Sequence, residues 1–232
     1  MSATKMNGAE SLVRTLIDGG IEVCFTNPGT SEMHFCAALD RVPGLRCVLG
    51  LFEGVVTGAA DGYGRMRDFP SATLLHTGPG LGNGLANLHN ARKARSPVVN
   101  IVGEHATYHI RHDAPLTSDI EGIAAPVSDW VKTSRNAEEV SRDGAQAIAE
   151  ARKTPGRIAT LILPADTAWN EASSGATVPS VPNPETVNSN ALDECVRVLR
   201  SGEPVMLLLG NKGLRACLLY KSPSPRDSIA SR

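Results

Sequence analysis

Short apolar runs alternate with amphipathic helical patterns along the first 168 residues of this chain. One helical pattern covers residues 6–19, with Asn7 as its expected N-cap and Gly19 at its end, and another covers 137–152. Strands that alternate with helices pair in parallel through crossover connections. We therefore predict an α/β fold, with a doubly wound, mostly parallel six-stranded sheet and helices on both of its faces. The expected strands are residues 21–25, 45–52, 71–76, 97–102, 130–133 and 157–164.

The composition of the chain changes after residue 168. Residues 169–190 are rich in Ser, Pro, Thr and Asn, which is typical of a linker. A helix over 191–199 and a buried strand over 204–210 predict that a second, incomplete α/β domain begins at residues 191–216. Residues 217–232 lack periodicity and caps, and CLLYKSPSPRDS resembles translated sequencing adapter. We expect this tail to be non-native or disordered and the reading frame to be truncated.

Composition narrows the functional classes. The chain has 41% hydrophobic and 20% charged residues and a formal net charge of -1, without Lys/Arg clusters, so we expect no nucleic-acid partner. No apolar run reaches membrane-spanning length and the N-terminus lacks an apolar signal core, which predicts a cytoplasmic protein without a membrane partner. Five widely spaced cysteines indicate free thiols rather than disulfides.

The stretch LFEGVVTGAADGYGRM, residues 51–66, contains one acid, Glu53, between an apolar run and a glycine- and alanine-rich helix. Open α/β sheets bind ligands at the edge where strands end and helices begin. A carboxyl group at this junction is therefore a candidate catalytic group. The alternative is that Glu53 is a first-turn acid that stabilises the start of a helix.

Two further motifs follow expected strands, NPGT at residues 27–30 and HTGPGLGNG at 76–84. Their glycines would let the backbone approach a ligand closely, ahead of a helix that runs toward Arg95. A dinucleotide-binding site is a second interpretation of the glycines in HTGPGLGNG. Such a site uses the first strand-to-helix turn and an acid at the end of the next strand, and this motif has neither feature. His105, His109 and His112 have a spacing that could suit metal ligands, but their loop setting predicts no metal site.

Together, NPGT, EGxxxxAADGYGR and HTGPGLGNG resemble, in order and in register, the N-terminal pyrimidine-binding domain of thiamine diphosphate enzymes of the acetolactate synthase and benzoylformate decarboxylase group. The resemblance implies that Glu53 is the catalytic glutamate, which hydrogen-bonds N1′ of the aminopyrimidine. It also implies cofactor contacts for Glu53, Pro28, Gly29, Gly80 and Asn83.

The same resemblance gives Thr30 and His76 substrate roles, as a carboxylate hydrogen bond and as a catalytic proton-transfer group. Thr30 could instead be the N-cap of the next helix, and His76 a structural residue at a strand end. Acetolactate synthases typically carry a residue other than His at position 76 and a glutamine where this chain has Glu104. His76 therefore favours decarboxylase chemistry, whereas TGPG is more similar to the synthases.

The family resemblance implies a lyase or transferase that acts on a small-molecule 2-oxo acid, either as a decarboxylase or as an acetolactate synthase-like carboligase. It implies thiamine diphosphate and Mg²⁺ as cofactors, a homodimer or homotetramer, and Mg²⁺ ligands in a C-terminal domain whose GDG motif is missing here. This fragment alone should then be inactive. A non-catalytic α/β binding or regulatory module is the alternative, and an NAD-binding protein is a third hypothesis.

Overall fold

A computed structural model describes residues 6–208 and 210 of the chain. Its main sheet has six strands, all parallel to their neighbours, in the order β3-β2-β4-β5-β7-β6. The predicted fold class is confirmed. The strands are β2 (Val23–Asn27), β3 (Arg46–Leu49), β4 (Ser71–Leu75), β5 (Val98–Glu104), β6 (Trp130–Thr133) and β7 (Ile158–Pro164).

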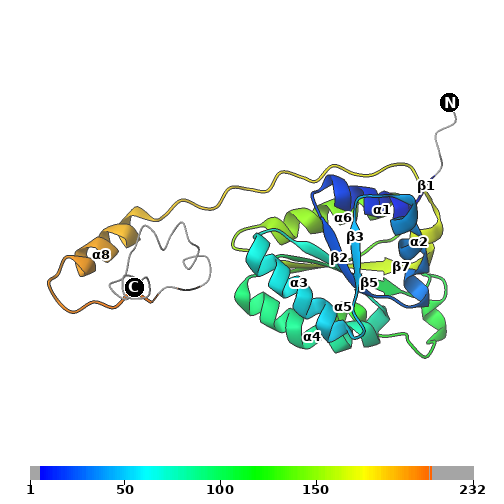
Figure 1. Cartoon of the computed structure of the whole chain (residues 1–232), viewed down its shortest axis with the longest axis horizontal. Coiled ribbons are helices and arrows are strands. Elements are labelled where there is room, and N and C mark those ends of the chain that lie inside the picture. The colour runs from blue at the N-terminus through cyan, green and yellow to red at the C-terminus, as the bar shows by residue number, and fades with distance from the viewer. Residues whose placement is uncertain (1–5, 209, 211–232) are drawn as a thin grey trace, which may run out of the picture. The chain divides into compact units, whose positions relative to one another are not determined.

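Helices cover both faces of this sheet (Figure 1). One face packs against α1 (Gly8–Asp18), α2 (Met33–Arg41), α6 (Ala137–Arg152) and the short α7 (Ala165–Trp169). The other packs against α3 (Glu53–Arg67), α4 (Thr77–Ala94) and α5 (Ile120–Ala124). Each face has its own cluster of fully buried aliphatic side chains, so the central strands are apolar on both sides.

The first helix begins as expected. The Asn7 side chain accepts a hydrogen bond from the backbone N–H of Glu10, and the Glu10 carboxylate accepts one from the N–H of Asn7. This capping box satisfies two N–H groups that a helix start leaves without partners. The sequence did not predict the antiparallel ribbon of β1 (Met6–Asn7) and β8 (Glu171–Ala172), which joins the helix start to the segment after α7.

The structure corrects the strand expected over residues 45–52, which is shorter and more exposed than its apolar sequence suggests. Strand β3 spans only Arg46–Leu49 and lies at the edge of the sheet, where it pairs with β2 alone. Its side chains are mostly exposed, and so are those of Leu51 and Phe52 beyond it. Apolar content did not reveal the edge position, because that position depends on strand order.

Two other boundaries also differ from the prediction. Helix α4 begins at Thr77, so the glycines of HTGPGLGNG lie inside its first turns and not in a preceding loop. The region 103–126, which the sequence left irregular, contains the end of β5, a 3-10 turn η2 (Ile110–His112) and α5.

The chain divides into two units, Met1–Asn183 and Pro184–Arg232. In the second unit α8 (Ser189–Leu199) forms where a helix was expected, with Asn188 as its cap. The strand expected over 204–210 is not formed in residues 204–208 and 210; a parallel strand needs a neighbouring strand as its hydrogen-bond partner. The prediction for the tail lies outside the described residues. Across the described part of the chain, no helix has the length and apolarity that crossing a bilayer requires.

Candidate functional site

Glu53 is the first residue of α3 and its side chain is buried, with 8% of the residue exposed. Its Oε2 atom accepts a hydrogen bond of 3.0 Å from Nδ2 of Asn83, on α4. Oε1 has no hydrogen-bond partner among the described residues. The structure thus brings together two residues that the sequence selected, and it leaves one carboxylate oxygen available to a ligand.

Helix α4 fixes the first turn of α3. Thr57 Oγ1 lies 3.0 Å from the carbonyl oxygens of Glu53 and of Gly84, and Asn87 Nδ2 donates to the carbonyl of Gly54 at 2.7 Å. A Cβ atom on Gly84 would come within 2.9 Å of the Thr57 methyl group. The small residues of both motifs therefore let the two helices approach closely, which holds Glu53 in place.

The second half of the stretch 51–66 has a structural role. Asp61 is buried and accepts two hydrogen bonds from Arg65, at 2.9 and 2.7 Å, and one from the Ser96 hydroxyl. A Cβ atom on Gly64 would lie 2.9 Å from the carbonyl oxygen of Pro97. These contacts join the end of α3 to the start of β5, so the motif DGYGR fixes the helix while Glu53 faces the candidate site.

Gly80 separates Glu53 from His76. A Cβ atom on Gly80 would lie 3.2 Å from Glu53 Oε1 and 3.5 Å from the Cβ atom of His76. The backbone angles of Gly80 are those of an ordinary helix, so glycine is not needed for its conformation. It matters here because it leaves space beside the side chains of Glu53 and His76. The candidate catalytic and proton-transfer residues therefore lie on two sides of one small residue.

His76 is hydrogen-bonded to Glu32, a residue that the sequence analysis missed. His76 Nδ1 lies 2.8 Å from Glu32 Oε2, and the same oxygen accepts the Gly29 backbone N–H at 2.7 Å. A Cβ atom on Gly29 would lie 2.4 Å from His76 Nδ1, so the imidazole packs on this glycine. The spacing of Gly29 and Glu32, as in a capping box, was the available signal.

Glu32 is 1% exposed, and burial raises the pKa of its carboxyl group, partly opposed by the Gly29 N–H and by His76. Its Oε1 atom is buried and has no hydrogen-bond partner among the residues that the structure describes. Glu104, at the end of β5, is also buried, and burial raises the pKa of its carboxyl group, with a smaller contribution from the charge of Glu32. Two carboxyl groups that resist ionisation thus lie at the carboxyl edge of β2 and β5.

The residue after His76 has a strained backbone. Thr77 has φ of 50°, in the left-handed region that β-branched residues rarely occupy. It is fully buried, and its hydroxyl has no hydrogen-bond partner among residues 6–208 and 210. Strain of this kind costs about 1–3 kcal/mol and concentrates at functional sites. It produces the sharp change from β4 to α4 at the position of His76.

Thr30 is not among the described residues that contact Glu53. It is exposed and is the first residue of the 3-10 turn η1 (Thr30–Glu32), whose cap is Gly29, so the N-cap interpretation of Thr30 is wrong. Thr30 lines a cavity of about 240 Å³, whereas Pro28 is half-buried in the turn after β2. The other residues of the cavity are Ser31, His105, Ala106, Tyr108, His109, Ala165 and Trp169.

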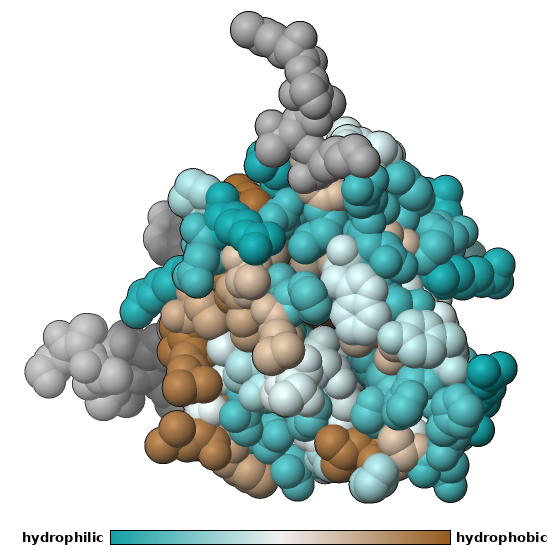
Figure 2. Space-filling view, turned by 90° about the vertical axis from the view of Figure 1, so that its right-hand side faces the viewer, coloured by the Kyte–Doolittle hydropathy of each residue, from teal (hydrophilic) through white to brown (hydrophobic). Residues whose placement is uncertain are grey.

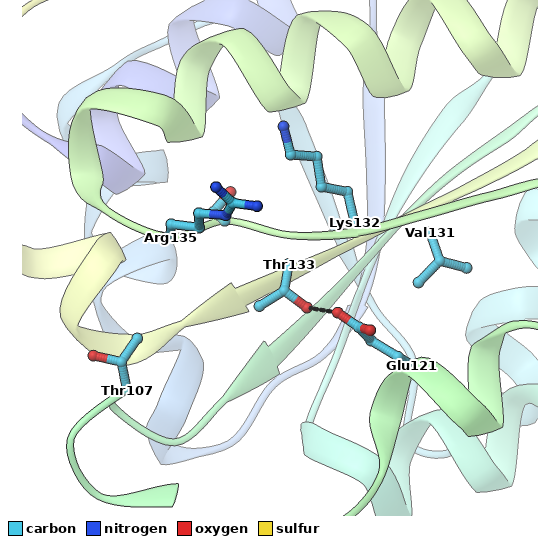
Figure 3. Close-up of a pocket in the computed structure, with 7 residues that line it drawn as sticks. Thr107, Glu121, Val131, Lys132, Thr133 and Arg135 are labelled. Carbon is cyan, nitrogen blue, oxygen red and sulfur yellow. Dashed lines mark hydrogen bonds between the residues drawn. The ribbon is translucent and has the colours of Figure 1, made fainter.

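A larger cavity, of about 460 Å³, lies near β6 at the opposite edge of the sheet from β3 (Figure 3). Several of its polar groups have partners: the Thr133 hydroxyl donates to Glu121, and Lys132 points toward α6, where it pairs with Asp143 at 2.7 Å. None of the candidate residues from the three motifs lines this cavity. Cavity size therefore does not identify the site here.

The three histidines that suggested metal ligands form a row of rings. The centroids of His105 and His109 are 5.7 Å apart, and those of His109 and His112 are 5.6 Å apart. Within the described ranges, no group of three or more His, Cys, Asp or Glu side chains is arranged to hold a metal ion.

Comparison with known proteins agrees with this geometry. Residues 6–123 match the family model "Thiamine pyrophosphate enzyme, N-terminal TPP binding domain". Among solved structures, the thiamine diphosphate-dependent 4-hydroxybenzoylformate decarboxylase of Rhodococcus jostii RHA1 is similar with a TM-score of 0.75 and 28% identity, over 84% of this chain and 38% of that chain.

Two curated relatives are similar in sequence. The "Putative acetolactate synthase large subunit IlvX" of Mycobacterium tuberculosis is 56% identical over 90% of this chain, and benzoylformate decarboxylase of Pseudomonas aeruginosa is 33% identical over 67%. The chain spans 40% of the length of the first relative and 29% of the second. The matched family region contains all three motifs and the side chains around Glu53 and His76. This chain therefore belongs to the thiamine pyrophosphate enzyme family, through the N-terminal TPP binding domain of that family.

Proposed function

We propose that this domain holds the aminopyrimidine ring of thiamine diphosphate and that it serves an enzyme acting on 2-oxo acids, as a decarboxylase or an acetolactate synthase-like carboligase. The observation that carries the proposal is the environment of Glu53. Its carboxyl group is buried at a helix start, one oxygen is held by Asn83, and the other faces the space left by Gly80.

These residues fit the cofactor ring chemically. A ring nitrogen that gains and loses a proton needs one carboxyl oxygen within reach, and a buried carboxyl group exchanges that proton with little competition from water. Glu53 Oε1 meets this need, because Asn83 occupies only Oε2. A side chain on Gly80 would stand 3.2 Å from Oε1 and would narrow the approach.

When bound, thiamine diphosphate supplies the electron sink that permits loss of carbon dioxide from a 2-oxo acid. The candidate site residues then have distinct proposed roles. Glu53 exchanges a proton with the ring nitrogen, His76 transfers a proton to or from the substrate, and the Thr30 hydroxyl donates a hydrogen bond to the substrate carboxylate. Gly29 contributes space for the His76 ring.

We also propose that the site is completed by a second subunit in a homodimer or homotetramer, and that Mg²⁺ and the diphosphate are held outside this domain. Exposed apolar side chains beside Glu53 support a protein partner here: Leu51 is 90% exposed, and Leu49, Phe52 and Val55 are exposed as well. Figure 2 likewise shows hydrophobic side chains gathered along one margin of a mainly hydrophilic face. Apolar groups of this size beside a site mark interaction surfaces.

Substitution of Glu53 tests the proposal. In the natural protein that carries this domain, Glu53→Gln keeps the size of the side chain and removes the exchangeable proton, so kcat for 2-oxo acid turnover at saturating thiamine diphosphate should fall about 10²-fold or more. Glu22→Gln, at an exposed carboxylate paired with Arg67, is the control and should leave kcat unchanged. Retention of more than about a tenth of kcat by Glu53→Gln would contradict the role of Glu53.

A further inference from the structure

Glu32 has an arrangement that folding alone does not explain. Its carboxyl group is buried, yet within the described part of the chain only Oε2 has hydrogen-bond partners and Oε1 has none. A buried carboxylate with an unpartnered oxygen is costly, and an apolar side chain of similar volume is often equally or more stable. The retained carboxyl group therefore points to a task other than stability.

The fold makes room for this group. A Cβ atom on Gly103, in β5, would lie 1.6 Å from Glu32 Oε1, so any other residue at position 103 would displace the carboxyl group. Gly29 supplies its backbone N–H from the other side, at 2.7 Å. Both neighbouring strand ends thus hold Glu32 in one orientation, with Oε2 toward His76.

This orientation determines which nitrogen of His76 carries its proton. Above the raised pKa of Glu32 its carboxylate is ionised and only accepts hydrogen bonds, so at such a pH the contact of 2.8 Å requires a proton on Nδ1. Nε2 is then the basic nitrogen, and it has no hydrogen-bond partner among the described residues. The His76 side chain is 23% exposed, so the imidazole is accessible to a ligand despite its contacts with Gly29 and Glu32.

We propose that Glu32 is a positioning residue for His76: it holds the Nδ1–H tautomer and presents Nε2 as the atom that exchanges protons with substrate. A carboxylate behind a histidine commonly fixes the tautomer and ring orientation in this way. The use of Nε2 toward a 2-oxo acid rests on the proposed function, whereas the tautomer itself does not.

The tautomer can be measured on the 232-residue chain without any ligand. In ¹⁵N-histidine-labelled protein at alkaline pH, where the imidazole is neutral and Glu32 is ionised, imidazole nitrogen shifts should show the proton on Nδ1. Glu32→Ala should transfer most of the population to the Nε2–H form. Glu104→Gln, at the neighbouring carboxyl group, is the control and should keep the Nδ1–H form. A parent chain with the proton on Nε2, or no change in Glu32→Ala that keeps a native amide spectrum, would overturn the proposal.

A second variant addresses loss of folding and a second readout addresses activity. Glu32→Gln preserves volume, and its amide oxygen can accept both the Gly29 N–H and the Nδ1–H, so this variant should keep the Nδ1–H form in a folded chain. In a full-length protein with this domain, Glu32→Ala should lower kcat for 2-oxo acids about 10- to 100-fold with KM little changed, as for outer hydrogen-bond partners of metal-bound histidines, and Glu32→Gln should retain most of the activity. Unchanged kcat in Glu32→Ala would contradict the positioning role. Absence of thiamine-dependent turnover in the parent, with the Nδ1–H form present, would contradict the proposed function alone.

Discussion

Oε1 of Glu53 faces Gly80, at 3.2 Å from the position that a Cβ atom on that glycine would occupy. The glycine comes from the third motif and the acid from the second, and the two lie on neighbouring helices, α3 and α4. Their contact explains why a helix that could contain alanine has glycine here. Replacing Gly80 by alanine adds one methyl group to the space beside Oε1 and so tests whether that space is needed for binding.

Gly80→Ala should reduce binding of thiamine diphosphate to this domain while the fold is kept. The added methyl group enters the space beside Glu53 Oε1 and His76, although alanine is better than glycine within a helix by roughly 1 kcal/mol. Amide shift changes near Glu53 and Asn83 during titration with thiamine diphosphate provide the measurement. They should be weaker in the variant than in the parent chain.

Gly82→Ala is the matched control for this substitution. It lies in the same helix, and nothing stands within 4 Å of the position that its Cβ would take. It should raise the melting temperature through helix propensity alone and leave the titration unchanged. If both variants bound the cofactor equally, the space beside Oε1 would not be the binding space.

Thr57→Val should destabilise the domain and displace the start of α3. The Thr57 hydroxyl bridges the carbonyl oxygens of Glu53 and Gly84 in a fully buried position, and valine leaves the carbonyl of Gly84 without this donor. The free energy of unfolding in urea should fall by about 1–3 kcal/mol. Thr57→Ser, which keeps the hydroxyl, should lose clearly less, and equal losses would assign the effect to the methyl group.

The alternation of apolar runs and helices within residues 1–168 was sufficient to predict the six-stranded sheet, because each run there became a strand and consecutive strands joined through helices. It could not show that β3 is an edge strand, since strand order depends on which faces pack together. Leu51 and Phe52 were therefore included in the expected strand, although the structure places them beyond β3 and exposes them.

The candidate site was predictable where a motif carried it and not where the fold assembled it. Glu53, Gly80 and Asn83 come from two motifs, and the structure places them beside one another. Glu32 was missed because its significance depends on the contact with His76, 44 positions away in sequence. Thr77 was missed because its left-handed backbone cannot be inferred from a β-branched residue.

Asp61→Asn should lower stability and leave the ligand site intact, because Asp61 belongs to the structural half of its motif. The substitution weakens the paired hydrogen bonds with Arg65 and the contact with Ser96 at the end of α3. We expect a loss of about 1–2 kcal/mol in urea unfolding and an unchanged midpoint in thiamine diphosphate titration. A shifted midpoint in the folded variant would assign Asp61 to the binding site.

Glu104→Gln should make the domain more stable at neutral pH than the parent chain, with a difference that disappears in acid. Burial raises the pKa of the Glu104 carboxyl group above its unfolded value near 4.5, so the folded state retains a proton that the unfolded state releases. Below pH 4.5 the Glu104 carboxyl group is protonated in both the folded and the unfolded state, so its burial does not lower the stability of the parent chain. As the pH rises from 4.5 through the folded pKa, this protonation-linked stability is lost, whereas glutamine stays neutral and can still accept the His105 N–H.

Melting temperatures of Glu104→Gln and the parent chain from pH 4 to 8 should therefore diverge, by roughly 2–4 °C for each kcal/mol gained. Glu22→Gln is a control of opposite sign, because its hydrogen bond with Arg67 lowers the pKa of Glu22 and its removal gives no gain on raising the pH. A difference between Glu104→Gln and the parent that did not grow with pH would show that Glu104 ionises freely in the folded domain.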